Sequence, residues 1–268
     1  MNILTWNIAR RKSRATSQVE YVVEQSVDVV ALQEVTPAYL AIVQPLLRDA
    51  GFEYQAHSLP STNDGRSNRS YGVLLASKSG LTDCDQARIP WQEKALTRLI
   101  DSPKGKIVFT TAYIPPGSSN GWIKIDTIEG VVAHKLAFKG RLRILCGDFN
   151  CPKSESTDGE IVTWAQVESE GGTRTKKRIR GGDGNRWDAA ERSLFTTLAE
   201  DGMNDVFRRV HGFKRQASSW HLMNRGREFP RRFDHCFSNI AAISCDYGHE
   251  PRIAGLSDHA PLITRFRI

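Results

Sequence analysis

The sequence lacks a long apolar run, a CxxC motif and a signal-like start. Each absence excludes a class of protein or site. No apolar run approaches the ~20 residues that span a bilayer, so we expect no membrane segment. The first residues enter an apolar strand at once, without the basic, apolar and small-residue progression of a signal peptide. The five cysteines include no CxxC pair, which argues against structural zinc and favours a reducing, cytoplasmic compartment.

The chain also lacks an internal repeat, a linker or a charge block that would divide it, so we expect one domain over residues 1–268. Its 40% hydrophobic content and mixed charge are typical of a soluble globular protein. The net charge of +7 and the pI near 9.3 favour a polyanionic substrate, although a basic surface can also serve solubility alone.

Hydrophobic periodicity predicts alternating strands and helices. The expected strands cover residues 3–8, 28–34, 71–77, 95–100, 107–113, 142–146, 232–238, 240–247 and 262–268. The expected helices cover residues 18–25, 37–50, 125–138 and 188–200. Residues 57–70 are predicted to form a loop, and so is a glycine-rich, basic segment at about 152–188. The basic run 174–180 in that segment suits a solvated, mobile loop that could also clamp nucleic-acid phosphates.

The stretch from Leu145 to Asn150 ends a buried strand in a tight, polar turn. Asp148 and Asn150 are two residues apart and therefore share one face, while Phe149 points to the core. A carboxylate and an amide at a strand's carboxyl end suit a hard cation or a phosphate oxygen. The same pattern is found as often in an ordinary turn.

Other expected strands end in short polar side chains in the same way. They supply Asn7, Glu34, Tyr113, Asp234 and the pair Asp258-His259. Because functional groups gather where strands end in α/β proteins, we expect these side chains to converge on one cleft. Ionisable groups directly after buried strands are costly unless they are paired or bound to metal.

Taken in chain order, these motifs resemble the endonuclease/exonuclease/phosphatase superfamily, which has the fold of DNase I and exonuclease III. The matching motifs are Trp6-Asn7, Gln33-Glu34, Tyr113 with Pro115, Gly147-Asp148-Phe149-Asn150, Asp205 with Phe207-Arg208, Ser219-Trp220, Arg232-Phe233-Asp234 and Ser257-Asp258-His259. The resemblance implies an α/β fold, a four-layer sandwich of two packed mixed β-sheets flanked by helices, with the site at one edge.

The resemblance also implies roles for the residues at the strand ends. Glu34 would be the main Mg²⁺ ligand, with Asn7 and Asp258 at or beside the metal, and Mn²⁺ is an acceptable substitute for such oxygen ligands. Asp148, supported by Asn150, would orient or deprotonate the attacking water. In the same scheme the imidazole of His259, held by Asp234, and the hydroxyl of Tyr113 would contact the scissile phosphate.

The tyrosine that precedes a proline at 113–115 resembles the exonuclease III and apurinic endonuclease branch. Two departures leave specific abasic-site cleavage unsupported: the chain reads Ile8-Ala9-Arg10-Arg11-Lys12 after its first asparagine, and Arg231 replaces the branch's pocket tryptophan. Trp220 could stack on a base or sugar. Arg98, Lys124 and Arg231 are further candidates for substrate contact. For Arg98 and Lys124, a solvated surface role is equally open.

From these features we expect a Mg²⁺-dependent phosphodiesterase that hydrolyses nucleic acid, preferably DNA, as an endonuclease or exonuclease through in-line attack of water. One alternative is a phosphatase or phosphodiesterase that acts on a small or lipid-borne phosphate. A second alternative is a nucleic-acid-binding protein that has lost the chemistry. No protein partner can be inferred from the sequence.

Overall fold

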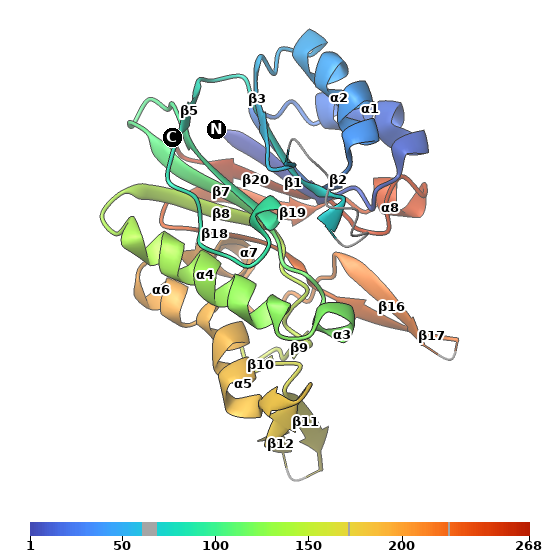
Figure 1. Ribbon diagram of the computed structural model, residues 1–268, viewed down its shortest axis with the longest axis vertical. Helices are drawn as coiled ribbons and strands as arrows, with labels where there is room; N and C mark the ends of the chain where they lie inside the picture. Colours follow the sequence, from blue (N-terminus) through green and yellow to red (C-terminus); the bar gives the residue numbers. More distant parts are fainter. Residues whose placement is uncertain (61–68, 171, 225) are drawn as a thin grey trace.

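The computed structural model describes residues 1–60, 69–170, 172–224 and 226–268 of the chain. At its centre two six-stranded sheets pack face to face, and helices cover both outer faces (Figure 1). Each sheet contains parallel and antiparallel neighbours. This arrangement confirms the predicted four-layer α/β sandwich of two mixed sheets. The extent of the domain, predicted as residues 1–268, stays a prediction.

The first sheet is built from both ends of the chain. Its strands lie in the order β19 (Ala242–Tyr247), β20 (Leu262–Phe266), β1 (Asn2–Asn7), β2 (Val29–Val35), β4 (Gly72–Ser77) and β3 (Tyr54–His57). Helices α1 (Ala15–Glu24) and α2 (Pro37–Asp49) cover its outer face. Helix α2 begins where the sequence predicts, because Thr36 accepts a hydrogen bond from the Tyr39 backbone N–H (3.2 Å) and Pro37 occupies the first turn.

The second sheet carries the central part of the chain. Its strands lie in the order β15 (Asn204–Asp205), β18 (Asp234–Ser238), β8 (Leu142–Asp148), β7 (Ile107–Tyr113), β6 (Ala95–Ile100) and β5 (Leu81–Asp83). Its outer face packs against α4 (Ile123–Ala137), α5 (Gly184–Ser193) and α6 (Thr197–Glu200). Short helices in the described residues include α3 (Gly117–Asn120), α7 (Val206–His211), α8 (Glu250–Ile253) and the 3₁₀ turns Lys12–Arg14 and Gln92–Lys94.

Strand alternation explains why polar strand ends face the space between the sheets. In β1, Ile3 belongs to the core between the two sheets, whereas Leu4 and Trp6 pack under α1 and α2. Side chains in a strand alternate between faces, so Asn7 at the end of β1 falls on the same face as Ile3. In β8 the same alternation places Asp148 on the face of Cys146, between the sheets.

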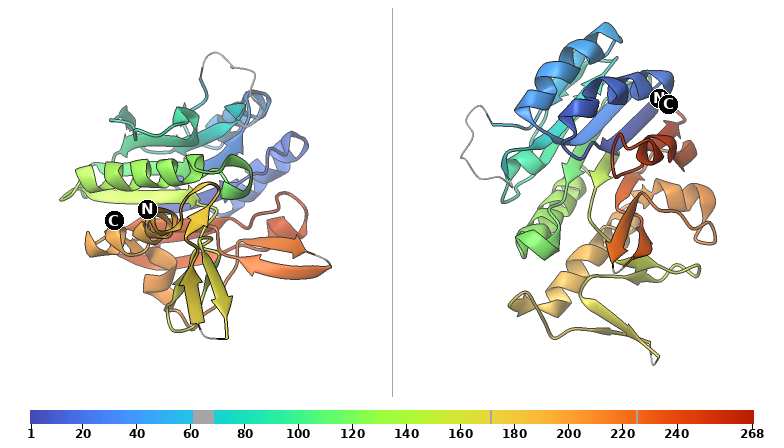
Figure 2. Two further views of the ribbon diagram at one scale, coloured as in Figure 1. Left: turned by 60° about the horizontal axis from the view of Figure 1, so that its bottom comes forward. Right: turned by 90° about the vertical axis from the view of Figure 1, so that its right-hand side faces the viewer.

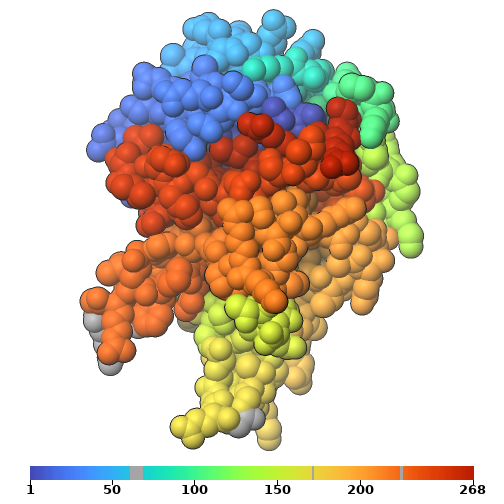
Figure 3. Space-filling model, turned by 180° about the vertical axis from the view of Figure 1, so that it is seen from behind, coloured from blue at the N-terminus to red at the C-terminus, as the bar shows by residue number. Residues whose placement is uncertain are grey.

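Short antiparallel hairpins occupy regions where the sequence predicts no strands. The pairs are β9 (Ser154–Glu155) with β10 (Ile161–Val162), β11 (Gln166–Ser169) with β12 (Gly172–Thr175), β13 (Arg178–Ile179) with β14 (Gly182–Asp183), and β16 (Trp220–Asn224) with β17 (Arg227–Arg231). The first three pairs replace the loop expected at about 152–188. The hairpins β11–β12 and β16–β17 project from the body as two separate arms (Figures 2 and 3).

Other predicted elements differ in detail from the structure. The single helix expected over residues 188–200 is two helices, α5 and α6, and α5 begins at Gly184. Strands β3 and β5 are too short and too polar to give an apolar pattern and were not predicted. Of the loop expected over residues 57–70, residues 61–68 lie outside the described part of the chain.

The five cysteines are all free thiols, and four of them are buried. Burial raises the pKa of Cys146, to about 12, and also that of Cys151, Cys236 and Cys245. Cys84, just after β5, is partly exposed. Among the described residues, no helix has the length and apolar character needed to cross a membrane.

Candidate active site

A pocket of about 670 Å³ lies where β2, β7 and β8 end, and it gathers most of the predicted site residues. The predicted residues that line it are Glu34, Tyr113, Lys124, Asp148, Asn150, Trp220, Asp258 and His259. The buried side chains of Asn7 and Asp234 lie behind this lining and hydrogen-bond to it. Segments far apart in the chain therefore converge on one site.

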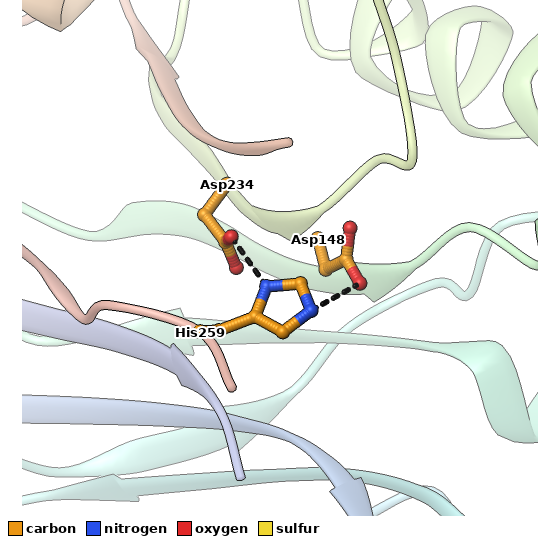
Figure 4. Close-up of side chains that lie close together, drawn as sticks. All are labelled: Asp148, Asp234 and His259. Atoms are coloured by element: carbon orange, nitrogen blue, oxygen red, sulfur yellow. Dashed lines mark hydrogen bonds and ion pairs between the residues drawn. The ribbon is translucent and has the colours of Figure 1, made fainter. Parts of the chain in front are cut away.

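His259 lies between two aspartates (Figure 4). Its Nδ1 is 2.7 Å from Asp234 Oδ2, and its Nε2 is 3.9 Å from Asp148 Oδ2. The two aspartates come from neighbouring strands, because the first residue of β18 is paired in register with the last residue of β8. All three side chains are buried, so their charges interact with little screening by water.

The loop that carries His259 is fixed on both sides. Ser257 Oγ donates to the backbone carbonyl of Asn7 (2.6 Å), and the indole N–H of Trp6 donates to the carbonyl of His259 (2.9 Å). The Ala260 N–H donates to the carbonyl of Ser219 (2.8 Å), and the hydroxyl of Ser219 in turn accepts from the N–H of Asp234 (3.1 Å). These bonds tie the imidazole to β1 and to the start of β18.

The surrounding carboxylates keep His259 charged. Burial alone would lower the pKa of His259, but Asp234 and Asp148 outweigh it and raise that pKa to about 10. Burial and the nearby Asp234 raise the pKa of Asp148, while the charge of His259 opposes them. The three groups lie close enough to hold a metal, with ligand atoms within 4.8 Å. A protonated imidazole cannot bind a metal, so this trio is better suited to proton transfer and charge stabilisation.

Glu34 reaches the pocket through a β-bulge that the sequence did not reveal. The pairing of β2 with β4 shifts between Gln33 and Val35, and Glu34 has a positive φ of 61°. Val35 therefore takes the place against the helices, and the extra residue, Glu34, lines the pocket. A left-handed backbone costs a non-glycine residue of order 1 kcal/mol or more, and such strain clusters at functional sites.

Asn7 links the two carboxylates nearest the pocket. Its Nδ2 donates to Glu34 Oε1 (3.1 Å) and to Asp148 Oδ2 (2.9 Å), while its Oδ1 accepts from the Ala9 N–H (2.9 Å). The second oxygen of Glu34 lies 3.0 Å from Nε of Arg10, a residue that is not among the site candidates predicted from the sequence. One amide therefore orients both acidic groups.

The donor set fits a hard divalent cation. Glu34 and Asp258 present carboxylate oxygens to the pocket, and Asn7 adds an amide oxygen with one lone pair already used by Ala9. The Glu34 side chain is 12% exposed, so a cation can reach it. Oxygen ligands with room for water suit Mg²⁺ or Mn²⁺ rather than zinc. Asp258 accepts a hydrogen bond from Trp220 Nε1 (3.2 Å), which holds this carboxylate at the pocket rim.

Asn150 and Lys124 shape the turn after β8. The Asn150 N–H donates to Asp148 Oδ1 (2.9 Å), and its Nδ2 donates to the carbonyl of Ile114 (2.9 Å). Lys124 is buried, with Nζ 2.6 Å from Glu191 and 2.9 Å from the carbonyl of Asn150. Glu191 neutralises this ammonium, and Lys124 stabilises the turn through its bond to the Asn150 carbonyl. The geometry therefore does not support the predicted phosphate contact of Lys124.

Tyr113 lies at the end of β7 with only 4% of its surface exposed. Its ring meets that of Tyr71 edge to face, with centroids 5.4 Å apart. Burial raises the pKa of Tyr113, so its hydroxyl stays a hydrogen-bond donor at neutral pH. Lys94, also buried, places Nζ 5.5 Å from the centre of the Tyr113 ring, and burial lowers the pKa of this lysine to about 7.

Two predicted substrate contacts lie outside the pocket. Arg98 is on β6, where its Nε is 3.4 Å from Asp83, and it does not line the pocket. Arg231 on β17 lines a neighbouring cavity, with its guanidinium 6.0 Å from the centre of the Trp164 ring. Trp220, by contrast, lines the pocket and stacks on Phe233 with centroids 5.4 Å apart.

Several lining residues come from the segment that the sequence describes only as basic and glycine-rich. They are Trp164, Lys176, Ile179, Arg180 and Trp187. Two tryptophans within a basic segment are a signal for a nucleic-acid or nucleotide surface, but the sequence does not show which of the neighbouring cations face the pocket.

The fold and the acidic, histidine-containing pocket together define a class of enzyme, the hydrolases that act on phosphoester bonds. The chain belongs to the Endonuclease/Exonuclease/phosphatase family, whose model matches residues 4–259. Members of this family generally depend on a divalent metal. A comparison with curated protein sequences returned no match.

Solved structures with the same fold cover this chain almost end to end. An AP endonuclease from Archaeoglobus fulgidus aligns with a TM-score of 0.73 and 18% identity, covering 100% of both chains. A variant of the 3′ phosphatase NExo from Neisseria, bound to a product DNA hairpin, gives 0.71 and 20% over 100% of both chains. D. rerio TDP2 complexed with a single-strand DNA product gives 0.68 and 16%, covering 100% of this chain and 99% of the other. At these identities the likeness establishes the fold.

Proposed function

We propose that this protein is a Mg²⁺-dependent nuclease that hydrolyses phosphodiester bonds of DNA by in-line attack of water. The observation that carries the proposal is His259, held as a cation between Asp234 and Asp148 at the wall of a pocket that also presents Glu34. A charged imidazole beside an oxygen-ligand site suits the negative charge that develops on a phosphate under attack. Mn²⁺ is the expected substitute for Mg²⁺.

In this mechanism Glu34 holds the cation, with Asn7 and Asp258 at or beside it. The bound cation would polarise the scissile phosphate and stabilise its added charge. Asp148 accepts the proton of the attacking water, and its raised pKa suits a base that works near neutral pH. Asn7 and Asn150 both donate to the Asp148 carboxylate and so fix the direction in which it accepts that proton.

On the other side of the phosphate, His259 donates from Nε2 to a phosphate oxygen. Asp234 accepts from Nδ1 and thereby keeps the ring oriented and charged. Tyr113, protonated because it is buried, donates its hydroxyl to a second oxygen.

Support for DNA as substrate comes from charge and from aromatic surface. The net charge of +7 attracts a polyanion, and Trp220 and Phe233 offer π-faces to a sugar or base. Two of the structures with the same fold named above are complexes with product DNA. A cytoplasmic location is part of the same proposal.

The test uses purified protein with Mg²⁺ and labelled plain duplex, abasic duplex, single-stranded DNA and RNA, with a phosphorylated inositol as the small-phosphate arm. We expect cleavage of at least one DNA substrate that is abolished by chelation and restored by Mg²⁺ or Mn²⁺. The product ends distinguish endonucleolytic from exonucleolytic cutting. Turnover of the inositol phosphate alone, with all nucleic acids intact, would refute the proposal in favour of a small-molecule phosphatase.

A further inference from the structure

The pocket has two chemically different ends. One end is acidic and is formed by the ends of β2 and β8, which carry Glu34 and Asp148, and by the loop that carries Asp258. The other end is formed by Trp164, Lys176, Ile179, Arg180 and Trp187, and it presents two cations, Lys176 and Arg180. The mechanism proposed above uses only the acidic end. A pocket of about 670 Å³ is much larger than one phosphate group requires, so a second group of the ligand fits at the basic end.

The cations at the basic end are free to bind an anion. Within the described parts of the chain, neither Lys176 nor Arg180 forms an ion pair with a carboxylate. Two other cations that line the pocket are paired: Lys124 lies 2.6 Å from Glu191, and Arg10 lies 3.0 Å from Glu34. The local charge therefore changes from negative to positive along the pocket.

The backbone that carries these two cations is held in place. The Lys176 N–H donates to the carbonyl of Ala165 (2.9 Å), and the indole N–H of Trp122 donates to the carbonyl of Arg180 (3.1 Å). Gly184 approaches so closely that a Cβ at that position would lie 1.7 Å from the carbonyl oxygen of Lys176. These contacts fix the cations relative to the body, as a binding site requires.

A row of aromatic rings connects the two ends. It runs from His259 to Trp220 (6.3 Å between centroids), then to Phe233 (5.4 Å) and to Trp164 (6.4 Å). Trp164 is itself fixed, because its Nε1 donates to the carbonyl of Asn150 (3.0 Å) at the turn beside Asp148. Only the Trp220–Phe233 pair is stacked and the other two contacts are tilted. Aromatic side chains in a binding groove stack on unpaired bases without regard to sequence.

We infer that Lys176 and Arg180 bind the phosphate next to the scissile one, and that Trp164 stacks on the base of the intervening nucleotide. This inference rests on the proposed nuclease function and names its substrate class as a nucleic-acid strand whose bases are unpaired at the cleavage site. A base that remains paired in a duplex keeps its faces covered by its neighbours, so it cannot stack on Trp164.

The experiment compares two substrates in wild-type protein and two double variants. One substrate is a short single-stranded DNA oligonucleotide, and the other is bis(4-nitrophenyl) phosphate, a diester without a second phosphate or a base. The test variant carries Lys176→Ala and Arg180→Ala. The matched control carries Arg174→Ala and Lys177→Ala, which removes the same charge from the same segment at residues that do not line the pocket.

In the test variant we expect the ratio of kcat/KM for the oligonucleotide to that for the small diester to fall about tenfold, with the loss mainly in KM. The slope of log(kcat/KM) for the oligonucleotide against log[salt] should become shallower by roughly 0.7, as for one phosphate contact on a single strand. The control variant should change neither the kcat/KM ratio nor the salt slope. An unchanged ratio in the test variant, or an equal loss in the control, would overturn the inference while leaving the nuclease function intact.

A second variant tests the stacking. Trp164→Leu should weaken binding of the oligonucleotide about tenfold, and an oligonucleotide with abasic sites at every position should bind wild type and variant equally. Binding is measured by fluorescence anisotropy without divalent metal, so it reports on the subsite even where no cleavage occurs. Equal loss for both oligonucleotides would overturn the stacking role. Failure of wild type to cleave either substrate, despite normal binding, would count against the nuclease function alone.

Discussion

Asp148 and Asp234 lie directly opposite each other on β8 and β18, on the face between the two sheets. Like charges in such a cross-strand pair destabilise a sheet unless a cation compensates them. His259 is that cation, and its Nδ1 and Nε2 face the two carboxylates from a third part of the chain. The pairing of β8 with β18 therefore brings two negative charges together, and the positive charge of His259 offsets their repulsion. Asp148, Asp234 and His259 are consequently one coupled unit.

The first prediction concerns that coupling. His259→Ala and Asp234→Ala should each lower kcat by roughly 10²-fold or more, and the double variant should lose little beyond the more damaging single change. The reason is that Asp234 acts mainly through the imidazole, to which it is hydrogen-bonded. Steady-state kinetics of wild type, both single variants and the double variant on a DNA substrate measure this double-mutant cycle. Losses that multiply in the double variant would show that the two side chains act independently.

The second prediction concerns pH. The charged form of His259 is the active one, so its contribution to activity should persist below its pKa and be lost as the pH rises through it, while protonation of Asp148 sets the acid side of the profile. Asp234 helps to raise that pKa, to about 10. Asp234→Asn should therefore lower the pKa and move the alkaline decline of kcat to lower pH. A pH–kcat profile of both proteins checks this, and an alkaline limb that stays in place would contradict the assigned charge.

The third prediction concerns the metal. Glu34→Gln removes the charge of the principal oxygen ligand, so Mg²⁺-dependent turnover should fall at least 10²-fold and calorimetric binding of Mn²⁺ should weaken. The melting temperature should change little, because the amide has the same shape and Glu34 remains near solvent. Glu24→Gln, on the exposed face of α1, is the control for loss of one carboxylate. Full activity in Glu34→Gln would remove Glu34 from the metal site.

The fourth prediction concerns acid stability away from the site. Burial would raise the pKa of Glu155, but Arg232 and Arg208 outweigh it and lower this pKa from 4.5 to about 2. A depressed pKa contributes stability that is complete above pH 4.5 and is lost as the pH falls through 2, here roughly 3 kcal/mol. Glu155→Gln should lower the free energy of unfolding by about that amount at pH 7.

Urea titrations between pH 2 and pH 7 measure this effect, and the difference between wild type and Glu155→Gln should shrink toward the acid end. Glu160→Gln is the matched control, because Glu160 lies in the same segment and is exposed. A difference that stays constant over the whole range would show that the two arginines do not depress the pKa of Glu155.

The fifth prediction concerns the glycine before Asp148. Gly147 has a φ of 140°, and a Cβ there would lie 1.9 Å from the carbonyl oxygen of Ala112 on β7. Gly147→Ala should therefore destabilise the protein by about 3 kcal/mol or more, because the parallel pairing of β7 and β8 must open. Gly140→Ala, also at positive φ but with open space around it, should cost only about 1 kcal/mol. Equal melting temperatures for the two variants would contradict this account.

Sequence patterns predict the fold well where hydrophobic burial decides the structure. The mostly apolar run 142–146 before Gly147 predicted β8, which extends two residues further, to Asp148. Helix α2 has its cap at Thr36 and its proline at the first turn, and it was predicted close to its bounds. The sequence also predicted that Asp148, Asp234 and His259 belong to one site, because polar groups next to strand ends gather at one cleft in α/β proteins and because the ordered motifs resemble the family.

The sequence could not reveal features that depend on tertiary contacts. The bulge at Glu34 arises from its pairing with β4, and the partner of Lys124, Glu191, lies on a different helix. Arg98 carries a charge like other candidates, but its place on β6 directs it to Asp83 rather than to the pocket. The hairpins between residues 152 and 188 have strands of two to four residues, too short for any periodic signal.

The distribution of thiols allows this protein to be labelled at a single position. Burial raises the pKa of all five thiols, but four of the cysteines are buried and only Cys84 is partly exposed, so a maleimide dye should react at Cys84 alone. Cys84 follows β5, which forms the opposite edge of its sheet from β15 and is separated from β8 by two strands. A fluorophore attached there would leave the catalytic face unobstructed and would need no engineered cysteine, so the wild-type chain can be labelled at one position for single-molecule observation.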